Sequence, residues 1–359
     1  GFQSHYSLTS GNANTSVGRG SGFATTTGGN NVAVGYTALA NNTTASNNTA
    51  VGWTALYSNT ASDNSAFGRE ALKANTTGTA NTGLGRDALR YNTTASNNTS
   101  VGHNNLFNTT TGASNTAVGA SALFSNTTAS YNTAVGYQAA YSNTTGIANV
   151  GLGAYALQLN TTGNYNTALG YNAGNAITTG LYNVAIGANA LDVSTTANSN
   201  IGIGVNALGS TTTGAENVAM GLNALLTNTT GASNVGIGTY ALNSNTTSSS
   251  NVAVGYQTLY SMSATGDANK STAVGYQAGY NSTHNVDAFG AQALYSNTTG
   301  VLSVAMGREA LYSNTTGSYN TAIGYQAGFF ITTGTKNTVL GRYNGNQGGL
   351  DIRTSSNNI

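Results

Sequence analysis

The sequence predicts an all-β protein, a parallel β-solenoid (β-roll) of about twenty 17-residue coils. A Gly preceded by a bulky apolar residue recurs along the chain, and most of these glycines are 17 residues apart. Apolar runs never exceed a few residues, and β-branched and aromatic residues flank the Gly, so short strands fit better than helices. The 359 residues include no Pro, which would delete a hydrogen bond from a ladder between coils.

The recurring glycines define the repeat. The interval is 17 residues except for one of 16 and then one of 20 followed by one of 15, and the unit is N-T-A-V-G-Y-Q-A-L-Y-S-N-T-T-G-S-x. One such unit cannot bury its own apolar residues, whereas stacked units can. The glycines are Gly18, Gly35, Gly52, Gly68, Gly85, Gly102, Gly119, Gly136, Gly153, Gly170, Gly187, Gly204, Gly221, Gly238, Gly255, Gly275, Gly290, Gly307, Gly324 and Gly341.

Each position of the unit has an expected role within a coil of two short strands. The residue before the Gly is apolar, as at Val34, and is expected to face a core. An Ala-Leu pair such as Ala38-Leu39 supplies a second apolar row. The Asn four places before the Gly is expected to hydrogen-bond to other coils and to turn backbone. The Thr-Thr pair, usually followed by Gly or Ala, predicts a turn.

The repeat also predicts the domain organisation. Residues 1–13 form an N-terminal lead-in or cap, 14–345 the solenoid, and 346–359 an exit segment that we expect to be truncated before a C-terminal domain. At about 4.8 Å per coil, twenty coils would span roughly 95 Å. The irregular spacings fall at 261–287, where a widened loop is a candidate binding element.

Composition excludes several classes of function. Charged residues make up 5% of the chain and the formal net charge is +1, which gives no electrostatic basis for binding nucleic acid. No stretch approaches the 18 apolar residues of a membrane helix, so membrane insertion is not expected. Apolar rows left on a slender solenoid would instead contact another copy of the chain. We therefore expect a homotrimer, a rod of three chains side by side.

The motif N-T-A-V-G-Y-Q-A at 132–139 resembles the repeat in the head of trimeric autotransporter adhesins, a left-handed parallel β-roll that trimerises. The longer unit, with its N-T-T-G turn, is similar to repeat segments of bacteriophage tail fibres, particularly those of marine phages. Residues 337–359 resemble the exit from such repeats toward an intramolecular chaperone domain, which promotes trimerisation and is then cleaved off.

The resemblance implies a structural and adhesive role, as the shaft or head of a homotrimeric fibre on a virion or another extracellular surface. Such a fibre contributes to host attachment, and its partner would be a host-surface glycan or an outer-membrane receptor. The resemblance brings no catalytic residues to this chain. A bacterial trimeric surface adhesin is the nearest alternative. A monomeric ice-binding solenoid that uses its Thr-Thr ladder is a third interpretation.

The ionisable residues do not predict an enzyme, a cofactor site or a metal site. His5, His103 and His284 are many coils apart, which does not fit the ligand spacing of a metal site.

Glu70, Asp87 and Glu309 each follow an Arg. We interpret them as solvated surface charges that do not pair with that Arg, because adjacent residues of a strand point to opposite faces. The alternative is a small surface network, since Arg69 and Arg86 are one coil apart and could stack with Glu70 and Asp87.

The candidate binding residues are the aromatic side chains that directly follow the repeat glycines. Their row is variable and so is expected to be exposed, and exposed rings on a rigid surface can stack on sugars. The alternative is that they cover neighbouring coils or fill a trimer seam. Trp53, the only Trp, is the best single candidate of the set Trp53, Tyr36, Tyr137, Tyr171, Tyr256, Tyr276 and Tyr325.

Overall fold

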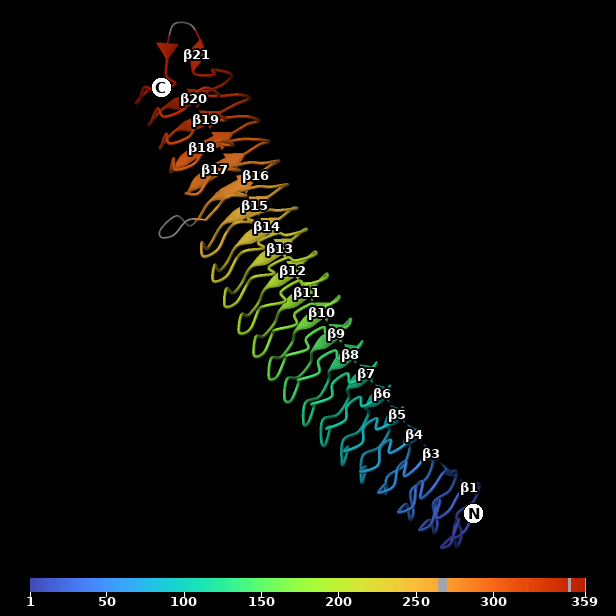
Figure 1. Cartoon of the computed structure of the whole chain (residues 1–359). Helices are drawn as coiled ribbons and strands as arrows, with labels where there is room; N and C mark the ends of the chain where they lie inside the picture. The colour runs from blue at the N-terminus through green and yellow to red at the C-terminus, as the bar shows by residue number, and fades with distance from the viewer. Residues whose placement is uncertain (264–269, 348–349, 359) are drawn as a thin grey trace. The chain divides into compact units, whose positions relative to one another are not determined.

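The computed structural model describes residues 1–263, 270–347 and 350–358. The chain divides into two compact units, Gly1–Leu181 and Tyr182–Ile359, and each is a stack of coils forming a parallel β-solenoid (Figure 1). The described residues contain no α-helix. Within them, therefore, no helix is long and apolar enough to cross a membrane.

In the first unit, each coil contributes one three-residue strand. The strands are β1 (Thr15–Val17), β2 (Val32–Val34), β3 (Thr49–Val51), β4 (Ser65–Phe67), β5 (Thr82–Leu84), β6 (Thr99–Val101), β7 (Thr116–Val118), β8 (Thr133–Val135), β9 (Val150–Leu152) and β10 (Thr167–Leu169).

The second unit repeats this arrangement and ends in a small antiparallel pair, β21 and β22. Its strands are β11 (Val184–Ile186), β12 (Ile201–Ile203), β13 (Val218–Met220), β14 (Val235–Ile237), β15 (Val252–Val254), β16 (Thr272–Val274), β17 (Val286–Phe289), β18 (Ser303–Met306), β19 (Thr321–Ile323), β20 (Thr338–Leu340), β21 (Asn346–Gln347) and β22 (Leu350–Asp351).

Strands of successive coils within a unit pair in parallel, and equivalent residues of the repeat lie beside each other. Thr116 pairs with Thr133, and Val118 with Val135. The prediction of a parallel solenoid with coils of about 17 residues is confirmed. The same register continues from β15 to β16, where Val252 pairs with Thr272 across the 20-residue interval. Part of that interval, residues 264–269, lies outside the described residues.

The expectation of two strands per coil is wrong, because the segment after the Gly is a series of turns. Thr37 and Leu39 both adopt left-handed backbone conformations, with φ of 47° and 54°, whereas a strand needs an extended chain. Their amides are nevertheless satisfied by the two adjacent coils. Thr37 donates to the carbonyl of Arg19 at 2.9 Å, and Leu39 donates to that of Ala55 at 2.9 Å. A coil can therefore be hydrogen-bonded on both sides while containing only one strand.

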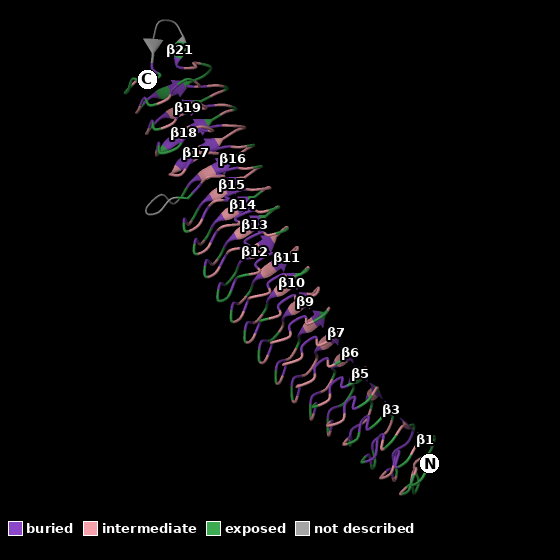
Figure 2. Ribbon diagram, viewed as in Figure 1, coloured by how far each residue is buried: buried purple, intermediate pink, exposed green. Residues whose placement is uncertain are grey.

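In most coils the core consists of the middle residue of the strand and the Ala-Leu pair, which are buried. Figure 2 shows buried segments recurring from coil to coil. The apolar residue before the Gly lies on the outer face instead, so the expectation that it faces a core is wrong. In β8, Ala134 is fully buried while Val135 is 38% exposed. The Leu row fills the interior: a Cβ on Gly83 would lie 3.4 Å from Leu72 Cδ1. Only a small residue fits easily beside that Leu.

The repeat Gly allows the chain to turn directly after the strand. Gly136 has a φ of 137°, a conformation that residues with a Cβ rarely adopt. A Cβ at this position would also lie 2.5 Å from the carbonyl oxygen of Gly153 in the next coil. Both the turn and the close stacking of coils therefore require glycine here.

Buried Asn side chains connect the coils, as predicted. The backbone N–H of Asn132 donates to the side-chain Oδ1 of Asn115 at 2.9 Å, and the side-chain Nδ2 of Asn132 donates to the carbonyl of Gly146 at 2.9 Å. A second Asn row, seven places after the Gly, was not predicted. There, Asn143 Nδ2 donates to Asn126 Oδ1 and to the carbonyl of Gly146, both at 3.0 Å. These bonds satisfy polar groups that would otherwise be costly to bury.

The two ends of the chain extend the stacking. In the lead-in, the amides of His5 and Ser7 donate to the carbonyls of Ser21 and Phe23 at 3.1 and 3.2 Å. In the exit segment, Asn358 accepts a bond from the amide of Thr338 at 2.7 Å. Described residues of both terminal segments are thus hydrogen-bonded to the repeats beside them.

Candidate binding surface

The outer face of the strands carries two rows of side chains, from the first and third strand residues. In β11 to β15 both rows are aliphatic, and we call these ten residues the aliphatic strand face. Its side chains are half-buried or exposed, for example Met220 and Ile237 at 37% each. The first row is Val184, Ile201, Val218, Val235 and Val252, and the second is Ile186, Ile203, Met220, Ile237 and Val254.

The same face of the first unit is more polar. Thr or Ser occupies the first strand position in eight of its ten strands, whereas the third position remains aliphatic or Phe. In β7, for example, Thr116 and Val118 point outward while Ala117 is buried. The strand face of β11 to β15 therefore differs in composition from that of the first unit, although all of these strands have three residues.

The predicted aromatic residues after the glycines lie on the surface, with exposed fractions from 42% to 55%. Each also contacts a side chain from an adjacent coil. Tyr36 stacks on Trp53 with ring centroids 6.4 Å apart and planes 13° apart. The guanidinium of Arg69 lies 5.2 Å from the centre of the Trp53 ring, and Arg19 lies 5.9 Å from that of Tyr36. Such cation–π contacts stabilise exposed rings modestly.

The other members of this row have similar neighbours. Tyr256 stacks on Tyr276 at 5.5 Å, and the edges of Tyr137 and Tyr171 meet Tyr155 at 5.4 and 6.0 Å. Tyr325 has Arg308 and Arg342 at 6.0 and 5.6 Å from its ring centre. These contacts favour the alternative that the rings cover neighbouring coils. Sugar stacking on this row stays a prediction.

A second aromatic row, five places after the glycines, was missed by the sequence reasoning. We call it the fifth-position row. In the second unit its rings are nearly parallel, with centroids 5.0 to 5.2 Å apart. Counting aromatic residues at a fixed distance from each Gly would have found it. Its stacked members are Phe107, Phe124 and Tyr141 in the first unit, and Tyr260, Tyr280, Tyr295, Tyr312 and Phe329 in the second.

Packing within this row disfavours ionisation of one of its hydroxyl groups. Burial raises the pKa of Tyr280, and the neighbouring Tyr260, Tyr295 and Tyr256 raise it further, because phenolates close together would repel each other. The Tyr280 hydroxyl is therefore uncharged at neutral pH.

The charged side chains in the turns after β4 and β5 form a network, which was the alternative to the favoured interpretation of solvated single charges. The Glu70 side chain is only 3% exposed, and its carboxylate lies 3.2 Å from Lys73 Nζ and 2.5 Å from Arg90 Nη2. Arg86 Nε donates to the adjacent Asp87 at 2.9 Å. Adjacent residues can pair because they lie in a turn and not in a strand.

The balance of these contacts sets the ionisation of Glu70. Burial alone would raise the pKa of its carboxyl group. The hydrogen bond from Lys73 and the charges of Arg90, Lys73 and Arg69 act in the opposite direction and together hold the pKa below its ordinary value of 4.5. Glu70 is therefore an ionised carboxylate at neutral pH.

The described residues contain no group of three or more His, Cys, Asp or Glu side chains that could hold a metal ion. His284 Nδ1 is 2.8 Å from the hydroxyl of Thr283. Burial lowers the pKa of His5 in the lead-in.

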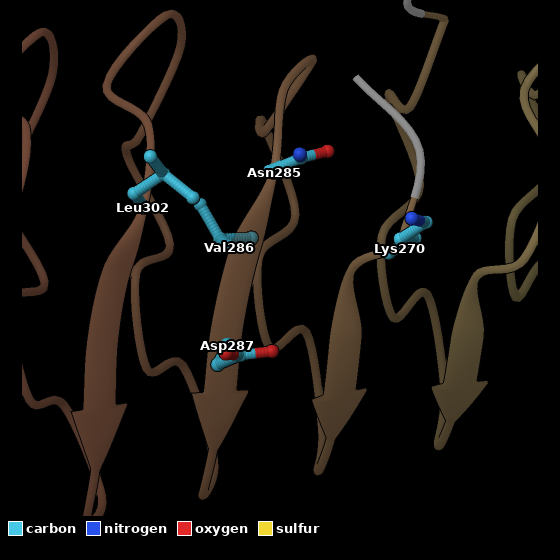
Figure 3. Close-up of a pocket in the computed structure, with 5 residues that line it drawn as sticks. All are labelled: Lys270, Asn285, Val286, Asp287 and Leu302. Atoms are coloured by element: carbon cyan, nitrogen blue, oxygen red, sulfur yellow. The ribbon is translucent and has the colours of Figure 1, made fainter. Parts of the chain in front are cut away.

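A small pocket of about 190 Å³ lies beside the irregular coil, in the segment predicted to contain a widened loop (Figure 3). Lys270, Asn285, Val286, Asp287 and Leu302 line it. Its lining includes the ammonium group of Lys270 and the carboxylate of Asp287, and the other three residues have no ionisable side chain. The adjoining residues 264–269 lie outside the described part of the chain.

The Thr-Thr pairs form a ladder at the turn. The first Thr hydroxyl donates to the backbone of the next coil, as from Thr76 to the carbonyl of Thr93 at 2.9 Å and from Thr93 to that of Thr110 at 3.0 Å. The second Thr of each pair, such as Thr77 or Thr94, is exposed. The first row of hydroxyls thus stabilises the stack and the second faces solvent.

Comparison of the chain with protein-family models, curated proteins and solved structures gives no match. The resemblance to tail-fibre and adhesin repeats accordingly depends on the repeat motifs alone. It stays a prediction, as do the localisation on a virion or extracellular surface and the absence of enzymatic activity.

Proposed function

We propose that the chain is a segment of a homotrimeric fibre that contributes to attachment at a host surface, as in a phage tail fibre. The observation that supports this most directly is the aliphatic strand face. Ten outward aliphatic side chains stand in two rows on five adjacent strands, with no charged side chain among them. A continuous apolar surface of this kind is typical of a contact with another chain.

A second copy of the same chain is the simplest partner for this face. Its rows have the same spacing along the solenoid, so copies aligned in parallel would place equivalent residues side by side. Burial of Ile201, Ile203 and Met220 against their counterparts would stabilise the assembly by roughly 25 cal/mol for each Å² of apolar surface removed from water. Three copies would turn these faces toward a common axis and leave the turns exposed.

Attachment to the host surface would then depend on many copies of the same weak contact. Weak contacts made by exposed side chains such as Trp53 and Tyr137 would recur in three copies, and multivalency would raise their combined strength. The partner would be a host-surface glycan or an outer-membrane receptor. The alternative, a bacterial trimeric surface adhesin, would have the same trimer of solenoids and would differ in the domain that anchors it.

Sedimentation-velocity ultracentrifugation of the purified chain tests the proposal. A species near three times 36.0 kDa is expected, and a monomer at 36.0 kDa would contradict it. A trimer would then be tested for binding to candidate host cells, with a heat-denatured sample as the control. A trimer that binds no glycan and no cell would limit the proposal to a structural role.

The exposed second Thr of each Thr-Thr pair favours one other function, an ice-binding solenoid. Thr77 and Thr94 are exposed at equivalent positions of adjacent coils. The ladder is weaker than an ice-binding face requires, because the first Thr of each pair donates its hydroxyl to the backbone. Thermal hysteresis of a monomeric sample would support this second candidate, and its absence would remove it.

A further inference from the structure

In the first unit, Ala40 is the non-aromatic residue of the fifth-position row that has an aromatic residue in the coil on each side. Phe23 stacks on Tyr6 with centroids 5.4 Å apart and planes 4° apart. The next coil has Ala40 at this position, and the coil after that has Tyr57. The backbone does not change at the interruption, since Ala24 donates to the carbonyl of Ala40 at 2.9 Å and Asn41 donates to that of Tyr57 at 3.1 Å. The coil with Ala40 therefore differs at this position only in lacking an aromatic ring.

The missing ring leaves a groove of about 310 Å³, which we call the Ala40 slot. Phe23 and Tyr57 stand on either side of it, and Ala40 lies at its base. Two coils separate these rings, roughly 10 Å in a parallel stack. Rings elsewhere in the row are 5.0 to 5.2 Å apart. The slot therefore has the width for one additional ring between Phe23 and Tyr57.

One polar side chain of the slot is accessible to a ligand. Asn41 lines the slot and is exposed, so its amide can donate a hydrogen bond to a ligand and accept one from it. Thr37 also lines the slot, but its Oγ1 atom is buried and so offers no surface to a ligand.

The slot also has an available positive charge. Arg19 lines it and lies over the ring of Tyr36, and no carboxylate in the described residues is within ion-pair distance of its guanidinium. By contrast, Lys73, which lines an adjoining groove, is paired with Glu70 at 3.2 Å. Arg19 is therefore the cation that can bind an anionic group of a ligand.

We infer that the Ala40 slot binds one pyranose ring of an acidic saccharide, with its carboxylate at Arg19. A pyranose has two apolar C–H faces and a polar edge. The faces match the rings of Phe23 and Tyr57, and the edge hydroxyls match the exposed side chain of Asn41. The choice of a saccharide depends on the proposed attachment function, whereas the existence of the slot does not.

A planar aromatic ligand fits these groups less well. It would stack between the two rings but would leave the Asn41 amide and the Arg19 guanidinium without partners unless it carried suitable substituents. A neutral sugar would use the rings and the amide but not Arg19. The combination of two ring faces, an exposed amide and one unpaired guanidinium favours an acidic sugar over both.

Titration of the full chain with methyl β-D-glucuronide, followed by saturation-transfer NMR, tests the inference. We expect a Kd on the order of 1 mM, typical of a single small ligand. Ala40→Tyr should complete the aromatic row and weaken binding at least tenfold without lowering the Tm. The matched control is Gln158→Tyr, which adds the same ring beside Tyr141 in the same row and should bind the sugar as the unchanged chain does.

Arg19→Gln separates the charge from the stacking. It should weaken binding of methyl β-D-glucuronide but leave binding of methyl β-D-glucoside unchanged. Unaltered glucuronide binding by Ala40→Tyr, or binding of phenol but of neither sugar, would overturn the inference. Sedimentation of the same samples distinguishes the two proposals: trimers that bind no sugar contradict only the slot, and monomers that bind it contradict only the trimeric fibre.

Discussion

The two units share their inner rows and differ in their outer rows. Leu123 in the first unit and Leu242 in the second occupy the same buried position, and both are fully buried. On the strand face, Thr116 of the first unit corresponds to Ile201 of the second. A coil thus folds with either a hydroxyl or an aliphatic side chain at this position. Folding determines the inner rows, and the outer rows are free to serve a contact.

The largest expected effect comes from placing a charge on the aliphatic strand face. Ile201→Asp should weaken self-association by at least about 100-fold, because the carboxylate would be buried without a partner in each copy. The monomer should still fold, since Asp287 already occupies the same row in β17, paired with Thr272. Sedimentation velocity over a range of concentrations measures the change.

Thr116→Asp is the matched substitution in the first unit. If the aliphatic strand face makes the contact between copies, this variant should sediment as the unchanged chain does or with a change of less than about tenfold. Equal dissociation by the two variants would show that both strand faces lie in the interface. The contrast in composition between the units would then have no consequence for assembly.

Substituting a residue of the inner row should lower the local stability by the same amount in both units. Leu123→Ala and Leu242→Ala each remove a fully buried side chain, and each should lower local stability by about 2–5 kcal/mol. Because a coil contacts only its neighbours, the loss should be confined to adjacent coils. Hydrogen exchange of the amides around each site measures it. Losses that differ severalfold would indicate that the inner rows are not equivalent.

Much of the fold could be predicted because the repeat itself carries the information. The 17-residue interval gives the parallel register, and the recurrent Asn gives a ladder such as that from Asn115 to Asn132. The orientation of the strand could not be predicted from hydrophobicity. Val135 is more apolar than Ala134, yet the Leu row already fills the narrow interior, so the smaller residue faces inward.

The candidate sites were less predictable, because they depend on neighbours in space. The exposed aromatic row was found from its variability, but only the structure shows that a ring such as Tyr325 is held between Arg308 and Arg342. The Ala40 slot exists because one coil lacks the aromatic side chain that the coils on both sides have. Its significance becomes visible only when Phe23 and Tyr57 are known to lie in one row of stacked rings.

A smaller effect should come from the coils in which Gly replaces the core Leu. At Gly174 the side chain of Ile177 fills the space, since a Cβ on the glycine would lie 3.0 Å from its Cδ1. Gly328 and Ile331 repeat the exchange in the second unit, where the same distance is 3.0 Å. Ile177→Asn should therefore cost about 2–4 kcal/mol through the cavity it leaves.

Adding Gly174→Leu to Ile177→Asn should recover most of that loss, because the pair then matches the Leu and Asn of the other coils. Denaturant unfolding of the single and double variants measures the coupling. The corresponding variants at Gly328 and Ile331 should behave alike. A double variant no more stable than the single one would show that Ile177 and Gly174 are independent.

The smallest expected effect is a difference in pH dependence between the units. The pKa of Glu70, in the first unit, is held below its ordinary value of 4.5. Its contribution to stability is therefore complete above about pH 4.5 and is lost as the pH falls through the lower, folded-state pKa. In the second unit, burial raises the pKa of Asp192 above its ordinary value of 3.8. That carboxyl group has the opposite effect, since its contribution is present in acid and is lost as the pH rises through the raised pKa.

Trp53 makes the first-unit effect measurable, because it is the only Trp and lies 5.2 Å from Arg69 and 5.7 Å from Lys73, two of the cations around Glu70. Thermal unfolding followed by its fluorescence should show a Tm that falls as the pH is lowered below about 4.5. Glu70→Gln should lower the Tm at neutral pH and flatten this dependence, with Asp192→Asn as the control that leaves it unchanged. An equally steep fall in Glu70→Gln would assign the acid sensitivity to other carboxylates, and the ion network would then contribute no more than exposed pairs usually do.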